Sequence, residues 1–310
     1  MSFLPVSRQD MEERGIEQLD FICFTGDAYI DHPTFGIAII SRMIEAAGFT
    51  VGVIAQPLCD ADYMKLGKPK YCFMVSGGNI DSMVSNYTVA LKKRFDDAYS
   101  PGGKGGRRPD RALTVYCQNL KRLYPDVEIS IGGLEASLRR FAHYDYWSDS
   151  LKPSVLVDSG ADLLTYGMGE RVVLDIARAM HNGYNLNLLR KLRQVAFLAD
   201  DRYVDSLGDE ALRLHGFEKC LKDRRAFGEN FVRIETESNR MEARTLVEPV
   251  GDRFVVINPP YPKLSEQELD HSFGLPYTRL PHPRYNGKGD IPAYEMIKFS
   301  VNLHRGCFGG

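Results

Sequence analysis

Short apolar runs alternate with amphipathic segments along the first 185 residues. Apolar runs bounded by Gly or Pro are typical of buried strands, and apolar residues three or four positions apart are typical of helices. Strands are predicted within residues 19–26, 50–57, 71–78, 127–133 and 161–169. Helices are predicted within residues 34–49, 79–96, 114–125 and 170–183. This alternation indicates an α/β fold with a doubly wound parallel sheet and helices on both faces.

Four of the predicted strands end in glycine, at Gly26, Gly77, Gly132 and Gly167. The carboxyl edge of a doubly wound sheet is where ligands bind, and glycine lets the backbone turn sharply against a ligand. A single glycine of this kind can equally serve the turn alone. The candidate cofactor-binding residues at this edge are His32, Gly36, Ser76, Gly77, Gly78, Gly132, Gly133, Gly169 and Glu170. Glu170 has a second interpretation, because an acidic side chain in the first turn of a helix also interacts favourably with the helix dipole.

Two segments interrupt this pattern. Residues 99–112, "YSPGGKGGRRPDRA", are rich in Gly, Pro, Lys and Arg and are predicted to form a mobile loop. This loop is either a solvated surface feature or a basic lid over an anionic ligand or RNA. Residues 139–150, "RRFAHYDYWSDS", contain the single Trp and three more aromatic residues. Such a cluster in a loop covers a pocket, forms a domain interface or packs the loop itself.

The regular alternation of predicted strands and helices ends near residue 185. Residues 186–297 are predicted to form a small α+β connector, with a long charged helical stretch at 207–241 and a hairpin within 243–260. A short helix capped by Ser265 is predicted next. Residues 298–310 are expected to be a strand that runs into a tight glycine turn containing Cys307. The predicted domains are therefore 1–185, 186–297 and 298–310.

Composition narrows the function classes. With 26% charged residues and a formal net charge of −2, the chain as a whole lacks the excess of basic residues that is typical of nucleic-acid-binding proteins. A locally basic face still leaves RNA open as a partner. The polar N-terminus does not resemble a signal peptide, and no run approaches the roughly 20 apolar residues of a membrane-spanning helix. A cytoplasmic protein without a membrane partner is predicted. The oligomeric state is left open.

The six cysteines are widely spaced and include no CxxC pair. Cys23 and Cys72 lie in strand-like runs, where a thiol behaves as a small hydrophobic group. Cys307 lies in a Gly-rich setting where a thiolate can meet a metal. One cysteine does not make a site, because an iron–sulfur cluster needs several thiolates.

The segment "EMIKFSVNLHRGCFGG" (295–310) resembles the entry to the cluster loop of radical S-adenosylmethionine (SAM) enzymes, in which a CxxxCxxC loop follows the first strand of a partial β/α barrel. It is most similar to the YgiQ family of these proteins. The segments "CFTGDAYIDHPTFG", "GGLEASLRRFAHYDYW" and "DSGADLLTYGMGER" also resemble that family, and the resemblance spans essentially all 310 residues.

This resemblance implies a Rossmann-type domain similar to cobalamin-binding modules, followed by a radical SAM barrel of which only the first strand is present. It implies a [4Fe–4S] cluster with Cys307 as its first ligand, SAM as cosubstrate and an unknown substrate. The second cluster cysteine would follow Gly310, so this chain alone is expected to be inactive by that route. The alternatives are a ligand-binding module for cobalamin, a nucleotide or RNA, and a scaffold domain that binds nothing.

The resemblance to cobalamin modules is weakest at the expected cobalt ligand. Those modules use a D-x-H-x-x-G loop, whereas here Asp31 is adjacent to His32 and Gly36 follows four residues later. His32 also precedes a proline, so it can simply form the entry turn of a helix. The pair Gly132-Gly133 resembles the glycines that such modules place against the nucleotide tail.

Overall fold

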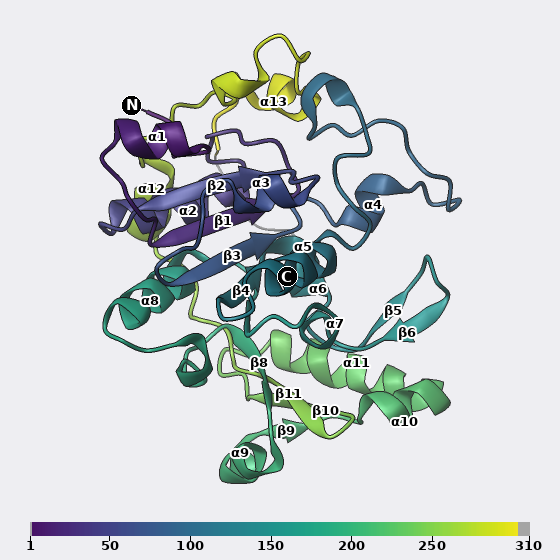
Figure 1. Cartoon of the computed structure of the whole chain (residues 1–310). Coiled ribbons are helices and arrows are strands. Elements are labelled where there is room, and N and C mark those ends of the chain that lie inside the picture. The colour runs from purple at the N-terminus through teal and green to yellow at the C-terminus, as the bar shows by residue number, and fades with distance from the viewer. Residues whose placement is uncertain (1, 303–310) are drawn as a thin grey trace.

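The computed structural model describes residues 2–302 and is built on one large sheet (Figure 1). Nine strands pair in the order β2-β1-β3-β4-β7-β8-β11-β10-β9. Their bounds are β1 Phe21–Thr25, β2 Val51–Ala55, β3 Cys72–Ser76, β4 Glu128–Gly132, β7 Leu163–Thr165, β8 Val195–Ala199, β9 Leu212–Arg213, β10 Leu246–Val250 and β11 Arg253–Ile257. A separate two-stranded ribbon contains β5 His143–Asp145 and β6 Ser150–Lys152.

The five predicted strands are confirmed and are parallel to one another. Strand β1 lies between β2 and β3, and β3, β4 and β7 continue the parallel half. Every residue of β1 and β2 is buried, as expected for strands covered on both faces by helices. The fold is therefore a mixed α/β fold with a large, mostly parallel sheet, consistent with the predicted Rossmann-type architecture.

Helices cover both faces of the sheet (Figure 1). Their bounds are α1 Arg8–Glu13, α2 Gly36–Ala46, α3 Asp60–Met64, α4 Ser82–Asn86, α5 Ala112–Leu123, α6 Gly133–Leu138, α7 Val155–Ser159, α8 Glu170–His181, α9 Asp201–Ser206, α10 Phe217–Lys222, α11 Arg224–Ser238, α12 Glu266–Phe273 and α13 Pro292–Ile297. One buried cluster on one face includes Phe24, Phe73 and Leu120. A second, on the opposite face, includes Phe21, Val53 and Ile176.

The helix predicted over residues 79–96 is wrong for most of its length. Only α4 forms, and the Asp81 side chain caps it by accepting hydrogen bonds from the Met83 and Val84 amides. The following residues have no surface to pack against, since Val89 is 86% exposed and Phe95 is 91% exposed. Because helices in proteins depend on packing of an apolar face, this stretch does not continue as a helix.

The sheet continues past residue 185. Strand β8 pairs antiparallel with β7, and β11 and β10 form the predicted hairpin beside it. Strands on both sides of the predicted boundary at 185 therefore share one sheet. Ser265 caps α12 through a capping box with Glu268, as predicted. The charged stretch 207–241 is not one helix, because β9, α10 and α11 divide it.

The C-terminal part folds back over the loop that follows β1. A third buried cluster joins Ile30 and Phe35 of that loop to Leu275, Tyr277 and Ile291. Backbone hydrogen bonds join the same two segments, from the Asp31 amide to the Leu280 carbonyl and from the His282 amide to the Tyr29 carbonyl. The segment 275–293 therefore covers the carboxyl end of β1.

The terminal strand predicted for residues 298–310 is not seen in its described part. Residues 298–302 contain no strand, and the preceding residues form α13, which starts with Pro292 at its first position. The predicted cluster ligand Cys307 lies outside the described residues. In the described part of the chain, no helix has the length and apolar character needed to cross a membrane.

Candidate functional site at the carboxyl edge of the sheet

A buried acidic residue follows each of the four glycine-ended strands. The four side chains are 1–3% exposed: Asp27 after β1, Asp81 after β3, Glu135 after β4 and Glu170 after β7. Each acid lies one to four residues beyond the glycine. Buried carboxylates need charged partners or hydrogen-bond donors, so the surroundings of this edge are polar despite being closed to solvent.

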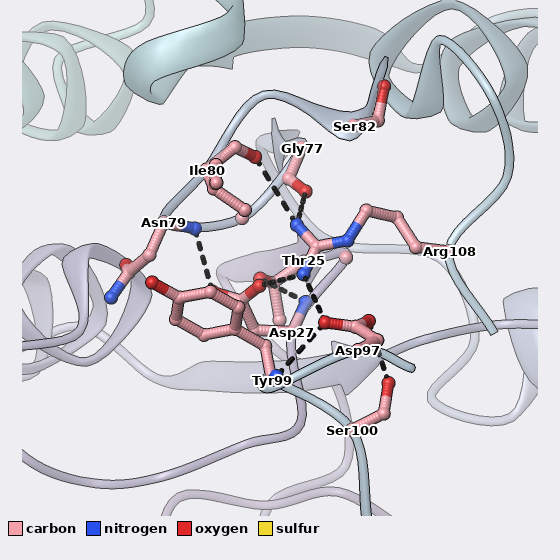
Figure 2. A network of polar contacts seen from close by, with 12 residues as sticks. Thr25, Asp27, Gly77, Asn79, Ile80, Ser82, Asp97, Tyr99, Ser100 and Arg108 are labelled. Atoms are coloured by element: carbon pink, nitrogen blue, oxygen red, sulfur yellow. Dashed lines mark hydrogen bonds and ion pairs between the residues drawn. The ribbon is translucent and has the colours of Figure 1, made fainter. Parts of the chain in front are cut away.

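Arg108 is the partner of Asp27. Its Nη2 donates to Asp27 Oδ1 at 2.7 Å, and its Nη1 donates to the Gly77 carbonyl at 2.9 Å (Figure 2). The same guanidinium lies 3.6 Å from Asp97, and the Arg108 side chain is 0% exposed. Burial works against its charge, but Asp27 and Asp97 more than offset this effect, so the pKa of Arg108 is raised. Of the two interpretations of the loop 99–112, the solvated surface feature is therefore wrong at Arg108, which anchors the loop to the sheet edge.

The residues before Arg108 close this network. Asp97 accepts hydrogen bonds from the Tyr99 amide at 2.9 Å and from Ser100 Oγ at 2.8 Å (Figure 2). The Tyr99 ring lies under the Arg108 guanidinium at 5.5 Å. Gln56, just beyond β2, donates to Ser100 Oγ at 2.6 Å. The network thus connects the carboxyl ends of β1, β2 and β3 to one long loop.

A second network lies beyond β3 and β4. Glu135 accepts hydrogen bonds from the Ser82 amide at 2.9 Å and the Leu113 amide at 3.2 Å, and burial raises the pKa of its carboxyl group. Arg139 donates twice to Asp81, at 3.0 and 2.9 Å. The two acids fix the start of α4 and α5 against α6.

The glycines allow this close packing. A Cβ atom on Gly26 would lie 2.2 Å from the Gly77 carbonyl oxygen, and one on Gly77 would lie 2.5 Å from Glu135 Oε2. Gly78 has φ +112° and lies against Asp27 and Arg108. A Cβ on Gly132 would lie 2.6 Å from Thr165 Oγ1. The space that the sequence assigned to a ligand is filled by the protein's own side chains.

The predicted residues of the β3 and β4 turns do come together. Gly133 has φ +85°, and a Cβ there would lie 2.6 Å from Ser76 Oγ. Ser76 Oγ accepts a hydrogen bond from the Gly78 amide at 3.1 Å. Ser76 is therefore engaged within its own turn, with Gly133 directly beside it.

His32 and Gly36 lie in the loop after β1. His32 is 2% exposed, and its Nδ1 accepts a hydrogen bond from the Thr34 amide at 3.2 Å. Burial, with Arg279 nearby, lowers the pKa of His32 to about 4, so the ring is neutral near pH 7. The Gly36 amide donates to Asn79 Oδ1 at 3.0 Å, which joins this loop to the β3 turn. Phe35 holds the cap position of α2 without a side-chain hydrogen bond.

Gly169 and Glu170 lie farther along the same edge, at the start of α8. A Cβ on Gly169 would lie 2.9 Å from Ile40 Cδ1 of α2, so this glycine permits α8 to pack closely on α2. Glu170 is buried in the first turn of α8. This placement agrees with its second interpretation, in which the carboxylate interacts with the helix dipole.

Sequence reasoning found the edge but missed the charges that occupy it. Asp27, Asp81, Glu135 and Arg108 were not among the predicted site residues. The signal that could have found the acids is the repeated acidic residue shortly after each terminal glycine. Arg108 carried no such signal, because only the fold separates it from the neighbouring Arg107.

The comparisons with known proteins decide the family. The family model described as "Radical SAM N-terminal" matches residues 3–300. The chain belongs to this family. A UPF0313 protein of Clostridium botulinum strain Loch Maree is 49% identical over 100% of this chain and 48% of its own length. UPF0313 proteins of Bacteroides thetaiotaomicron and Porphyromonas gingivalis are 47% and 48% identical over 99% of this chain and 52% and 49% of their own lengths. The predicted resemblance to the YgiQ family is confirmed.

This member of the Radical SAM N-terminal family spans about half the length of the curated relatives it matches. Iron–sulfur clusters require thiolates, and the described cysteines do not supply them. Cys23, Cys72 and Cys117 are fully buried, and burial raises the pKa of each thiol, that of Cys23 to about 12. No group of three or more His, Cys, Asp or Glu residues suited to a metal ion occurs within residues 2–302. The described residues do not fit a cluster.

The described residues also do not fit a cobalamin at the glycine-ended edge of the sheet. The turn at Gly132-Gly133 is filled by Thr165 and Ser76, and the loop bearing His32 is covered by residues 275–293. His32 Nδ1 is held by Thr34. We therefore derive no chemistry through cobalamin at this edge.

Proposed function

We propose that this chain is the N-terminal part of a radical SAM enzyme and serves as the scaffold for its catalytic barrel. The observation that carries the proposal is the match of the Radical SAM N-terminal family over residues 3–300. The chain covers 48% of the Clostridium botulinum relative, so the remaining half of such a protein provides the length for a barrel. A [4Fe–4S] cluster bound there would supply the electron that cleaves SAM reductively and starts radical chemistry on the substrate.

In this proposal Cys307 is the first cluster ligand, and the segment before it connects the domain to the barrel. The described domain contributes rigidity rather than ligands. Its carboxyl edge is filled by the Asp27–Arg108 and Asp81–Arg139 ion pairs. This filling supports the scaffold alternative over a cofactor module at the same edge.

The test uses the protein extended to the full length of its relatives, reconstituted with iron and sulfide without oxygen. We expect the visible absorption shoulder typical of an iron–sulfur cluster, together with bound iron and sulfide. When the cluster is reduced, we expect 5′-deoxyadenosine to form from SAM. Cys307→Ala should abolish all three. Cys59→Ala is the matched control, because Cys59 is an exposed cysteine of the described domain and should not affect them. A cluster that is indifferent to Cys307→Ala would contradict the assignment.

The scaffold role is tested separately on the 310-residue chain. Titration with hydroxocobalamin, SAM and a bulk tRNA preparation should give no saturable binding at the glycine edge. Saturable binding of hydroxocobalamin that His32→Ala removes would instead make the domain a cobalamin module. Saturable binding of SAM that survives His32→Ala but is lost with a substitution at Gly133 would point to a nucleotide site at the β4 turn.

A further inference from the structure

Three basic side chains surround a small pocket beyond the carboxyl end of β2. The pocket has a volume of about 160 Å³, and Arg107, Arg284 and Lys288 contribute to its lining. Its floor includes Ala55, the last residue of β2, and Gln56. It is distinct from the filled glycine edge after β1, β3 and β4.

These cations have no carboxylate partners. Within residues 2–302 none of the three forms an ion pair, whereas the adjacent Arg108 is buried against Asp27. Arg107 and Arg284 are half-buried, so their charges are partly removed from water. Placing like charges together without a counter-charge is unfavourable, which indicates that an anion completes the arrangement.

The single acid in the pocket does not supply that counter-charge. Asp62 accepts hydrogen bonds from the Leu58 amide at 2.9 Å and the Cys59 amide at 3.4 Å, where it caps α3. Three cations and one carboxylate leave a formal charge of +2 around the pocket, since 3 − 1 = 2. Burial and the nearby Arg284 lower the pKa of Lys65 to about 8, so this lysine is still mostly protonated near pH 7 and adds to the positive charge.

Both arginines lie near Tyr285, and Arg284 contacts its ring. The Arg284 guanidinium lies 5.6 Å from the Tyr285 ring, and the Tyr285 hydroxyl accepts a hydrogen bond from the Tyr29 amide at 2.8 Å. Burial raises the pKa of Tyr285, while Arg284 and Arg107 both oppose this shift, as expected when two cations approach the same ring. A planar guanidinium fixed in this way suits bidentate recognition of phosphate oxygens.

A second pocket adjoins the first across Arg107. It has a volume of about 190 Å³ and shares Leu58 and Arg107 with the first pocket. Its other lining residues include Pro57, Tyr63, Pro109, Val115 and Asn119, which are neutral, and Asp60, whose charge is paired with Arg122 at 2.5 Å. Such a lining suits an organic group with a ring and a few hydroxyls.

We propose that this pair of pockets binds a small organic phosphate, with the phosphate between Arg107, Arg284 and Lys288 and the organic part beside Tyr63. The site does not depend on the proposed radical chemistry. The basic segment at 99–112 thus has two roles, in which Arg108 fixes the loop to the sheet and Arg107 contacts the ligand.

The test is calorimetric titration of the 310-residue chain with ribose 5-phosphate, ribose and inorganic phosphate at constant ionic strength. We expect ribose 5-phosphate to bind more tightly than inorganic phosphate, and ribose not to bind. A hydrogen bond to a charged group contributes about 1.5–3 kcal/mol, so Arg107→Gln and Arg284→Gln should each weaken binding by about tenfold or more. Arg202→Gln removes an exposed arginine of α9 and should change nothing.

Thermal unfolding of each variant checks that the fold is intact, since neither Arg107 nor Arg284 has an ion pair to lose within the described residues. Ribose 5-phosphate binding that is equal in the wild type and in Arg107→Gln/Arg284→Gln would overturn the proposal. So would the absence of binding by any of the phosphates. Binding of polyuridylate that ribose 5-phosphate does not displace would assign the basic residues to an RNA surface instead.

Discussion

At the scale of single residues, Arg108 joins segments that are distant in the sequence. Its guanidinium contacts Asp27 after β1, the Gly77 carbonyl after β3, and Asp97 in the long loop (Figure 2). Arg107, its neighbour in the chain, has no ion pair within residues 2–302. The two arginines therefore provide a comparison in which the residue type is the same and only the surroundings differ.

Arg108→Gln should destabilise the protein by about 3–5 kcal/mol, because it leaves two buried carboxylates without a counter-charge. Urea denaturation in phosphate-free buffer measures the free energy of unfolding. Arg107→Gln is the control and should change it by less than about 0.5 kcal/mol. Equal effects of the two substitutions would show that the buried network does not stabilise the sheet edge.

At the scale of elements, a buried glutamate connects the second half of the sheet to the first. Glu248 of β10 is 2% exposed and accepts a hydrogen bond from the Ala142 amide at 2.8 Å, just before the β5–β6 ribbon. Burial raises the pKa of Glu248 from its ordinary value of 4.5 to about 7. The folded protein therefore holds this proton more tightly than the unfolded chain does.

This shift gives a pH-dependent prediction. The stabilisation from the protonated Glu248 is fully present below pH 4.5 and is lost as the pH rises through 7. Glu248→Gln keeps an oxygen for the Ala142 amide and removes the cost of ionisation. It should stabilise the protein at pH 8 by about 2–3 kcal/mol more than at pH 4.5. Denaturation at both pH values measures the difference, and the exposed Glu242→Gln should show none. A Glu248→Gln effect independent of pH would contradict the assignment.

At the scale of the whole molecule, the first two of the three predicted domains share a sheet and a core. Strand β8 continues the sheet from β7, and one buried cluster contains Phe24 and Ile131 together with Leu214, Leu246, Val255 and Ile257. The family model also spans 3–300 without a break. We therefore expect the described residues to unfold as one cooperative unit.

Calorimetry of the 310-residue chain should show a single unfolding transition. Residues 1–185 alone should not fold cooperatively, because β7 becomes an exposed edge and several large core side chains are lost. Each such side chain contributes roughly 1.5–3 kcal/mol, and their sum is comparable to the roughly 5–15 kcal/mol of total stability of a domain. A stable piece of residues 1–185, with a sharp transition of its own, would instead support the predicted boundary.

The periodicity of apolar residues correctly predicted the five parallel strands and the main helices, because those elements are defined by local spacing. It failed for residues 79–96, where an apolar pattern has no packing partner. It also failed for the start of the last predicted strand, because residues 298–302 contain no strand and directly follow α13. Local patterns do not show which surface a segment meets, and that surface decides whether the segment becomes ordered as a helix or a strand.

For the site, the sequence by itself determined that glycines end the strands at one edge, and its motifs determined the family. Only the tertiary structure decided what fills that edge. Asp27, Arg108 and Glu135 are separated by tens of residues, and their pairing depends on how the loops fold over the sheet. Glycine is required at these positions whether the backbone packs against a ligand or against a side chain, because in both cases a Cβ atom would occupy the space.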